Sequence, residues 1–202
     1  MITRSSLLSL MSKDQPDLRI RRTQKMLRQA FIKLVTDQGF DGISVQMLAD
    51  EAMINRATFY RHYEDLYDLA EKIYASLAAE YVASIQEIIF DKPEDATKKL
   101  FEHIAEYADF YQSMLATMPR FHGWVRKNIE DEFRAMFFQM GFKEEGLALP
   151  LDVAVRYMAH AQIGLVEWWL ETGQQATVDD MARYLTQLHL IGGIQSMQTG
   201  QP

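Results

Sequence analysis

Residues 42–69 read GISVQMLADEAMINRATFYRHYEDLYDL. Ser44 is a good N-cap for a short helix in this stretch, because its hydroxyl can accept a hydrogen bond from a free backbone amide. The apolar residues of that helix share one face: Val45, Leu48, Ala49 and Ala52. A break over residues 53–55 ends with Asn55, which can cap a second helix over residues 56–63. Two short helices joined by so short a turn predict a helix-turn-helix.

The second helix of this pair has the side chains of a DNA-recognition helix. Phe59 is expected to point inward, whereas Arg56, Thr58 and Arg61 remain available to DNA bases. An arginine can donate two hydrogen bonds to guanine, and a threonine offers a methyl group to thymine and a hydroxyl to an acceptor. These three residues are therefore the predicted sequence-reading residues.

An amphipathic helix is predicted ahead of the pair, over residues 19–38, because its apolar residues recur at helical spacing. Gly39 follows as a C-cap. Arg21 lies near the start of this helix together with Arg22 and Thr23, and helix N-termini favour anions. We therefore expect these residues to contact DNA phosphates.

The chain after the pair continues as helices without strand-like alternation. These helices are separated by proline and glycine residues, and they are predicted over residues 66–90, 94–118, 124–140, 151–172 and 178–191. The sequence thus predicts an all-α protein: a mobile arm at 1–16, an N-terminal three-helix bundle with the helix-turn-helix at 17–65, and a larger helical domain at 66–202. The arm is either a disordered tail or a stretch upstream of a start at Met11.

The charge distribution bears on the partner. A formal net charge of -7 argues at first against nucleic acid, because a DNA duplex is a polyanion. Residues 1–65 nevertheless hold ten basic and eight acidic side chains, whereas the remainder holds eleven and twenty. This asymmetry favours a DNA-facing segment joined to an acidic body, with ordinary surface variation as the alternative.

Several classes of protein are disfavoured. Cysteine is absent, so disulfides and thiolate zinc sites are excluded. No apolar run approaches the roughly 20 residues of a membrane span and no signal peptide is present, which predicts a cytoplasmic protein without a membrane partner. No histidine follows an acidic residue by three positions, and no HExxH, glycine-rich phosphate loop or serine nucleophile elbow occurs. We expect no enzyme activity, cofactor or metal.

Residues 42–69 resemble the signature of the TetR family of regulators. The matching residues are Gly42, Ser44, Leu48, Ala49, Ala52, Ile54, Thr58, Tyr60, His62, Tyr63 and Leu69. The resemblance covers about residues 19–75, and residues 156–190 are more faintly similar to a subgroup that includes regulators of dihydroxyacetone kinase operons. It implies a homodimer on a near-palindromic operator in double-stranded DNA, and a repressor that a small-molecule effector releases. Activation in place of repression stays open.

The resemblance also implies roles for individual residues. Gln46 and Ala57 are further base-facing positions, Tyr60 and His62 hold phosphates, and Ser44 lies at the same surface. Taken alone, Tyr60 could equally be an aromatic residue packed in the core, and His62 an ordinary surface histidine. Their common spacing and capping favour DNA binding.

Three residues depart from the pattern of the family. Met53 and Ala57 stand where glycine is common, so the local backbone angle or the approach to the groove is expected to differ. Leu66 stands where many members have a phosphate-binding lysine. That contact is either lost or supplied by the helix N-terminus alone.

The larger helical domain is predicted to dimerise and to bind an effector. One helix-turn-helix neutralises few phosphates, so a dimer is expected, with an interface on the last two helices: Met158, Leu165, Trp168, Met181, Leu185 and Leu188. Polar side chains among apolar ones suggest a ligand pocket, formed by His103, Tyr107, Tyr111, Met114, His122, Phe137, His160, Gln162 and Glu167. A solid core that responds to a protein partner, or to nothing, is the alternative.

Overall fold

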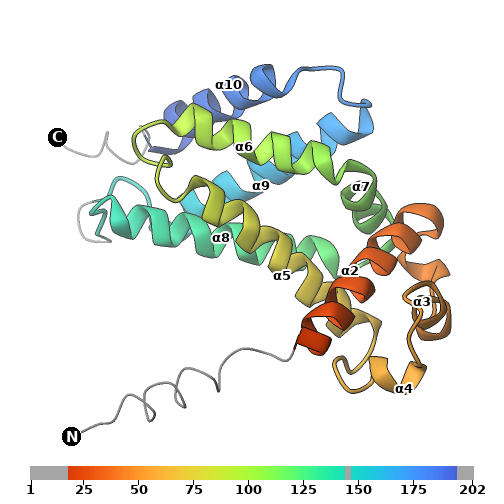
Figure 1. The fold of residues 1–202 in the computed structure, drawn as a ribbon. Helices are drawn as coiled ribbons and strands as arrows, with labels where there is room; N and C mark the ends of the chain where they lie inside the picture. Colours follow the sequence, from red (N-terminus) through yellow and green to blue (C-terminus); the bar gives the residue numbers. More distant parts are fainter. Residues whose placement is uncertain (1–17, 144–146, 195–202) are drawn as a thin grey trace, which may run out of the picture.

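The computed structural model describes residues 18–143 and 147–194, and the regular elements in those ranges are all helical (Figure 1). In chain order they are α2 (Leu18–Gln38), η1 (Phe40–Gly42), α3 (Val45–Glu51), α4 (Arg56–Phe59), α5 (Leu66–Ile85), α6 (Pro93–Glu106), α7 (Ala108–Thr117), α8 (Phe121–Gln139), α9 (Leu151–Glu171), α10 (Val178–Leu188) and η2 (His189–Ile194). The predicted all-α fold is confirmed. The predicted arm over residues 1–16 lies outside the described residues.

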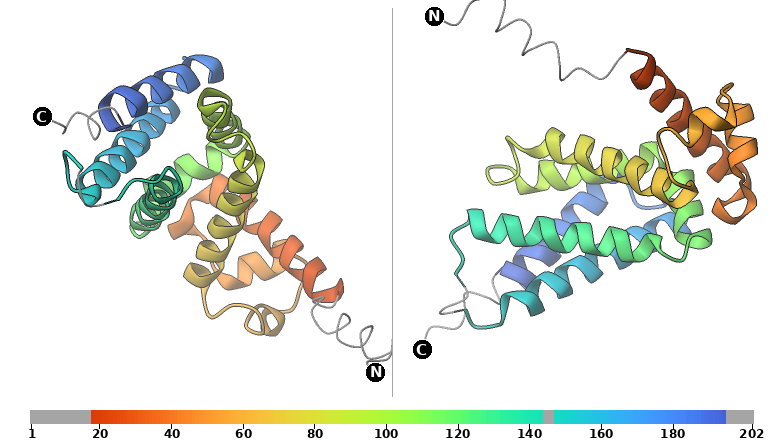
Figure 2. Two further views of the ribbon diagram at one scale, coloured as in Figure 1. Left: turned by 90° about the vertical axis from the view of Figure 1, so that its left-hand side faces the viewer. Right: turned by 90° about the horizontal axis from the view of Figure 1, so that it is seen from below.

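Helices α2, α3 and α4 gather at one end of the molecule, which we call the head (Figures 1 and 2). The buried side of α2 packs against α3 and also against α7 of the body. Phe31 at the centre of α2 meets Phe40 and Phe110 edge to face, with ring centroids 6.3 Å apart in both pairs. The head therefore shares one hydrophobic core with the body.

The remaining helices form the body, with α10 on the side far from α3 and α4 (Figures 1 and 2). The long α5 leaves the head and packs against α6, which also packs against α10. A second apolar cluster lies where α8 meets α9, and Phe137 and Val155 are fully buried in it. Amphipathic helices of this kind are stable because each buries its apolar stripe against a neighbour.

The prediction of a single helix over residues 94–118 is wrong, because this stretch is divided into two helices. It breaks at Tyr107, where φ is −117° and ψ is 28°, so α6 and α7 are separate helices. Nothing in the local sequence marks this break, since neither proline nor glycine is present there. The bend turns α7 onto α2 and η1, and this packing overrides the local helical preference.

Other predicted bounds need smaller corrections. The helix expected over 56–63 keeps α-helical geometry only to Phe59 and then tightens, with His62 N–H donating to the Phe59 carbonyl at 2.9 Å. The helix expected over 66–90 ends at Ile85. The one expected from residue 124 begins at Phe121, and the last one ends at Leu188 before a π-helical turn.

Candidate functional site

The helix-turn-helix is built by two side-chain caps. Ser44 accepts a hydrogen bond from Met47 N–H at 3.2 Å at the start of α3. Asn55 accepts one from Ala57 N–H at 2.8 Å at the start of α4. Each cap satisfies a backbone donor that the helix leaves free, so both predicted helix starts are confirmed. The Ser44 side chain is thus engaged in structure, although it remains exposed.

The turn between the two helices contains a strained residue. Met53 has a φ of 52°, in the left-handed region, and its side chain is 82% exposed. An L-residue with a Cβ pays a steric cost there that glycine does not pay. The chain therefore adopts at Met53 a backbone conformation that glycine would adopt with less strain.

Three residues predicted to contact DNA lie on the outer face of α4 and just after it. Phe59 is fully buried, whereas Arg56, Ala57 and Arg61 are exposed. Arg56 lies over the ring of Tyr60, 5.5 Å from its centroid, and donates to its hydroxyl at 3.2 Å. This contact holds the guanidinium beside the phenol, and the helix that begins at Arg56, α4, lies at the outer end of the head (Figure 1).

The other predicted DNA residues are distributed around this face. Thr58 and His62 are partly buried, and Gln46 on α3 is exposed and donates to Asp50 at 2.8 Å. At the start of α2, Arg22 is exposed, and Thr23 donates its hydroxyl proton to the Arg19 carbonyl at 2.9 Å. Thr23 is therefore occupied within its own helix.

The N-terminus of α5 is acidic. Asp65 caps it by accepting from Asp68 N–H at 2.8 Å, and Asp68 pairs with Lys72 at 2.9 Å. Leu66, the first residue of the helix, packs against the core. Two carboxylates already occupy the position at which a helix terminus would attract a phosphate, so this end is unfavourable to DNA.

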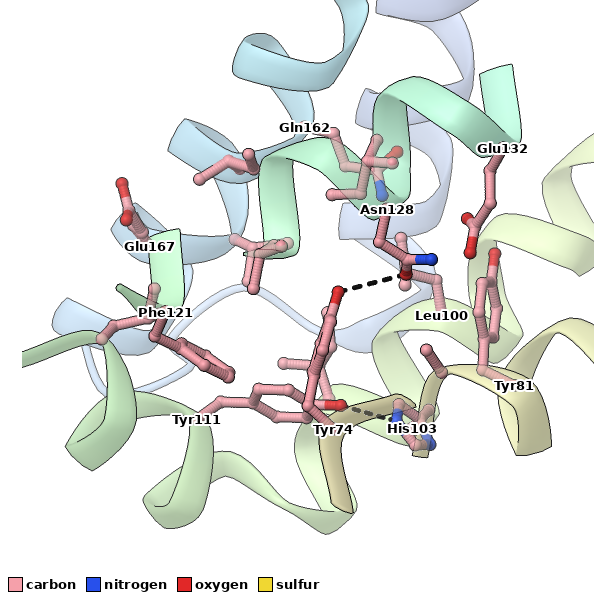
Figure 3. Close-up of a pocket in the computed structure, with 17 residues that line it drawn as sticks. Tyr74, Tyr81, Leu100, His103, Tyr111, Phe121, Asn128, Glu132, Gln162 and Glu167 are labelled. Atoms are coloured by element: carbon pink, nitrogen blue, oxygen red, sulfur yellow. Dashed lines mark hydrogen bonds between the residues drawn. The ribbon is translucent and has the colours of Figure 1, made fainter. Parts of the chain in front are cut away.

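A cavity lies inside the body between α5, α6, α7, α8 and α9 (Figure 3). Its volume is about 80 Å³. The residues that line it are Tyr74, Ala78, Tyr81, Leu100, His103, Ile104, Tyr111, Leu115, Phe121, Val125, Asn128, Ile129, Glu132, Gln162, Ile163, Val166 and Glu167. Mostly apolar walls with a few polar groups are the usual character of a small-molecule site.

Two hydrogen bonds order the polar groups of the cavity (Figure 3). The Tyr74 hydroxyl donates to Asn128 Oδ1 at 3.2 Å, and the Tyr111 hydroxyl lies 2.8 Å from His103 Nε2. Burial lowers the pKa of His103 and raises the pKa of both tyrosines. These groups are therefore neutral near pH 7.

The carboxyl group of Glu132 is the exception among the polar groups. Figure 3 shows it directed from α8 toward the Tyr81 hydroxyl. Burial raises its pKa to about 7, well above the ordinary range of a glutamate. Sequence reasoning missed Glu132 along with Tyr74, Tyr81 and Asn128, because nothing in the pattern of α5 or α8 distinguishes an inward polar residue from a surface one.

The predicted pocket residues divide into two groups. His103, Tyr111, Gln162 and Glu167 line the cavity. The others do not: Met114 and Phe137 are fully buried in core clusters, Tyr107 lines two other depressions, His122 is an exposed partner of Glu167, and His160 is exposed. Helical spacing alone did not tell which face of each helix turns inward.

The predicted dimer residues also need correction. Met158, Met181 and Leu185 are at most 1% exposed within the chain itself, so they have no surface to offer a partner. Met158 belongs to the apolar cluster between α8 and α9. Met181 and Leu185 lie on α10, which packs against α6, and both are buried in the core that head and body share. Leu165 is partly exposed and Trp168 and Leu188 are exposed, so these three remain available.

The described residues contain neither a cluster of metal-binding side chains nor a helix that could span a membrane. In residues 18–143 and 147–194, no three histidine or acidic side chains lie close enough together to hold a metal ion. Within the same ranges, no helix combines the length and apolar character needed to cross a bilayer.

Helix-turn-helix and helical body both match known families. Residues 28–73 match the bacterial regulatory proteins of the tetR family, and residues 91–190 match a transcriptional regulator C-terminal region of the same group. The chain belongs to the TetR family of transcriptional regulators. The resemblance noted in its sequence is thereby confirmed.

One curated relative and two solved structures illustrate the similarity. The uncharacterized HTH-type transcriptional regulator YxbF of Bacillus subtilis (strain 168) is 26% identical over 179 residues, which are 86% of this chain and 46% of the relative. The chain thus spans about half the length of that relative. The dihydroxyacetone kinase operon activator DhaS has the same fold, with a TM-score of 0.64, 19% identity, and coverage of 86% of this chain and 97% of its own.

A second solved structure contains a ligand. FadR from Bacillus subtilis, a transcriptional regulator solved in complex with stearoyl-CoA, matches with a TM-score of 0.60 and 15% identity, covering 81% of this chain and 96% of its own. At these identities the two structures establish the fold that this chain shares with them.

Proposed function

We propose that this protein binds operator DNA as a homodimer through α4, represses transcription there, and leaves the DNA when a small molecule occupies the cavity of the body. The observation that carries the proposal is the capped helix-turn-helix whose outer face exposes Arg56, Ala57 and Arg61. The cytoplasm is the proposed location, because bacterial regulatory proteins of this family would meet their DNA there.

The roles on DNA follow from position and chemistry. Arg56 and Arg61 suit guanine edges, and Thr58 suits thymine. Tyr60 and His62 suit phosphates at the flank of the helix. Contacts to base edges carry the sequence information, whereas contacts to phosphates fix the position of the protein.

A binding series with variants tests these roles. Arg56→Ala and Thr58→Ala are expected to cost about 1–3 kcal/mol on the preferred sequence and to relax discrimination at one base position. His62→Ala is expected to weaken all sequences about equally. Lys127→Ala removes an exposed positive charge from α8 and serves as the control. Specific binding that survives Thr58→Ala unchanged would count against α4 as the recognition helix.

The dimer is proposed to form through the exposed faces of α9 and α10. Apolar side chains are exposed there: Val153, Tyr157 and Trp168 on α9, Tyr184 and Leu188 on α10, and Ile191 just after it in η2. The positions on α9 recur at helical spacing, and the exposed Gly164 between them lets another helix approach closely. Exposed apolar residues that gather on one surface are typical of an association site, and a two-fold axis makes the same surface serve both subunits.

The effector is proposed to act through α7. One side of α7 brings Tyr111 to the cavity. The other side bonds to the head, because Ser113 donates to the Val35 carbonyl at 2.6 Å and Phe40 N–H donates to Thr117 Oγ1 at 2.8 Å. A ligand that displaces Tyr111 therefore shifts the helix that holds α2 and η1. The effect requires tighter ligand binding to the DNA-incompetent arrangement.

Repression, in place of activation, is the expected direction. A reporter gene placed behind a DNA site that the protein binds tests this direction. Deletion of the regulator should raise expression of the reporter. A fall in expression would assign an activating role, the role that the name of DhaS gives to that relative of similar fold.

A further inference from the structure

The cavity holds one carboxyl group that has no cationic partner among the described residues. Glu132 reaches it from α8, and the seventeen described residues that line the cavity include neither lysine nor arginine. The second acidic residue, Glu167, is already paired with His122 at 2.7 Å. Its side chain points away from the other polar groups in Figure 3. The cavity is therefore electrostatically suited to a positive charge.

The walls around Glu132 suit a cation as well. The rings of Tyr74, Tyr81 and Tyr111 line the same space, and their hydroxyl groups stay neutral because burial raises their pKa. Tyrosine rings attract a cation over their faces. The Asn128 amide oxygen adds an acceptor within this cavity. Ammonium donors thus find a carboxylate, an amide oxygen and aromatic faces together.

An apolar extension adjoins this polar space. A second cavity of about 110 Å³ shares Tyr81, Leu100 and Gln162 with the first. Phe133, Met136 and Met158 give it an apolar wall. The first cavity, at about 80 Å³, has room for several water-sized groups, and the second has room for a short hydrocarbon chain.

We propose that the effector is an organic cation, a protonated amine with a short apolar tail, whose ammonium group pairs with Glu132 and whose tail enters the second cavity. This inference rests on the proposed function. Burial raises the pKa of Glu132 to about 7, and an adjacent ammonium group would lower it again by favouring the charged carboxylate. Anionic ligands such as the stearoyl-CoA bound by FadR carry phosphates, for which this lining offers no cation among the described residues.

Calorimetric titration of the full chain with three matched probes tests the inference. Hexylammonium, hexanol and hexanoate share one tail and differ in charge. Hexylammonium is expected to bind about tenfold more tightly than hexanoate, and Glu132→Gln to remove about that factor from hexylammonium. Glu132→Gln should leave hexanol binding unchanged, which shows that the cavity is intact. Asp131→Asn, an exposed change of the same charge on the adjacent residue, is the control.

Operator release, measured in parallel, separates this inference from the proposed function. Three results would overturn the proposed ligand class. Hexanoate could bind more tightly than hexylammonium, or Glu132→Gln could leave hexylammonium binding intact. The third such result is that none of the three probes binds. Hexylammonium that binds through Glu132 without weakening the DNA complex supports the ligand class and counts against effector-controlled release.

Discussion

Met53 is the residue at which backbone and side chain conflict most in the head. Its φ of 52° is unfavourable for an L-residue, and its exposed side chain gains little from packing. We expect Met53→Gly to raise the free energy of unfolding by about 1 kcal/mol, because glycine relieves the strain. Chemical denaturation followed by circular dichroism measures the change.

Ala57 provides the matched control for that substitution. It is also exposed and also stands where glycine is common in the family, but it lies in the regular turn of α4. Ala57→Gly should therefore lower the free energy of unfolding, by up to about 1 kcal/mol. Equal signs for the two substitutions would contradict the assignment of strain to Met53.

Glu132 predicts a pH dependence of stability. Its pKa rises from an unfolded value near 4.5 to about 7, so the folded state holds the proton more tightly and stability falls as pH rises through this interval. The full loss is about 3 kcal/mol. Glu132→Gln should therefore be more stable than the parent above pH 7 and no more stable below pH 4.5, as thermal denaturation at several pH values will measure.

His189 also makes stability depend on pH, so the stability of Glu132→Gln must be compared with that of the parent at each pH. Burial lowers the pKa of His189 to about 4, so its contribution to stability is lost as pH falls from about 6.5 toward 4. This trend opposes that of Glu132 in the same interval and partly hides it in the parent. A difference between Glu132→Gln and the parent that does not change with pH would contradict the burial of the Glu132 carboxyl.

Helix α7 is the element that joins body to head, and Thr117 is its critical contact. The hydroxyl of Thr117 accepts from Phe40 N–H at 2.8 Å. Gly39 allows this approach, because a Cβ there would lie 2.9 Å from Thr117 Cγ2. Thr117→Val keeps the shape but leaves the Phe40 amide without its acceptor. We expect a loss of about 1–3 kcal/mol of stability and faster hydrogen exchange over η1.

Thr172→Val is the control for that change. The Thr172 hydroxyl donates only to carbonyls of its own helix, at 2.9 Å to Trp168 and 3.2 Å to Trp169. Its replacement should change stability and exchange little. If Thr117→Val alters exchange over η1 no more than Thr172→Val does, α7 is not the connection between cavity and head.

Sequence reasoning was most successful where an element is defined locally. Ser44 and Asn55 mark helix starts by their own side chains, so α3 and α4 were predicted within a few residues. The break at Tyr107 follows from packing between α7 and α2, which residues far apart in the chain produce together. For the same reason the pattern found His103, Tyr111, Gln162 and Glu167 but missed Glu132 and included the buried Phe137.

At the scale of the whole molecule, the exposed faces of α9 and α10 predict a dimer. Trp168 on this surface is 47% exposed, and Trp168→Glu should convert a dimer of 23.4 kDa chains into monomers at micromolar concentration. Phe138, 81% exposed on α8, is the control, since Phe138→Glu adds the same charge outside the proposed interface. Sedimentation equilibrium gives the mass, and dissociation by both variants or by neither would contradict the interface.

Selection of bound sequences from a random DNA pool tests the proposed regulator most directly. A dimer that reads through two copies of α4 should enrich a two-fold symmetric site, with half-sites about one helical turn apart or a multiple of it. Selection with Thr58→Ala should then lose preference at the same position in both half-sites. A pool without enrichment, an asymmetric site, or a symmetric site that Thr58→Ala and Arg56→Ala both leave unchanged would contradict DNA reading by this helix.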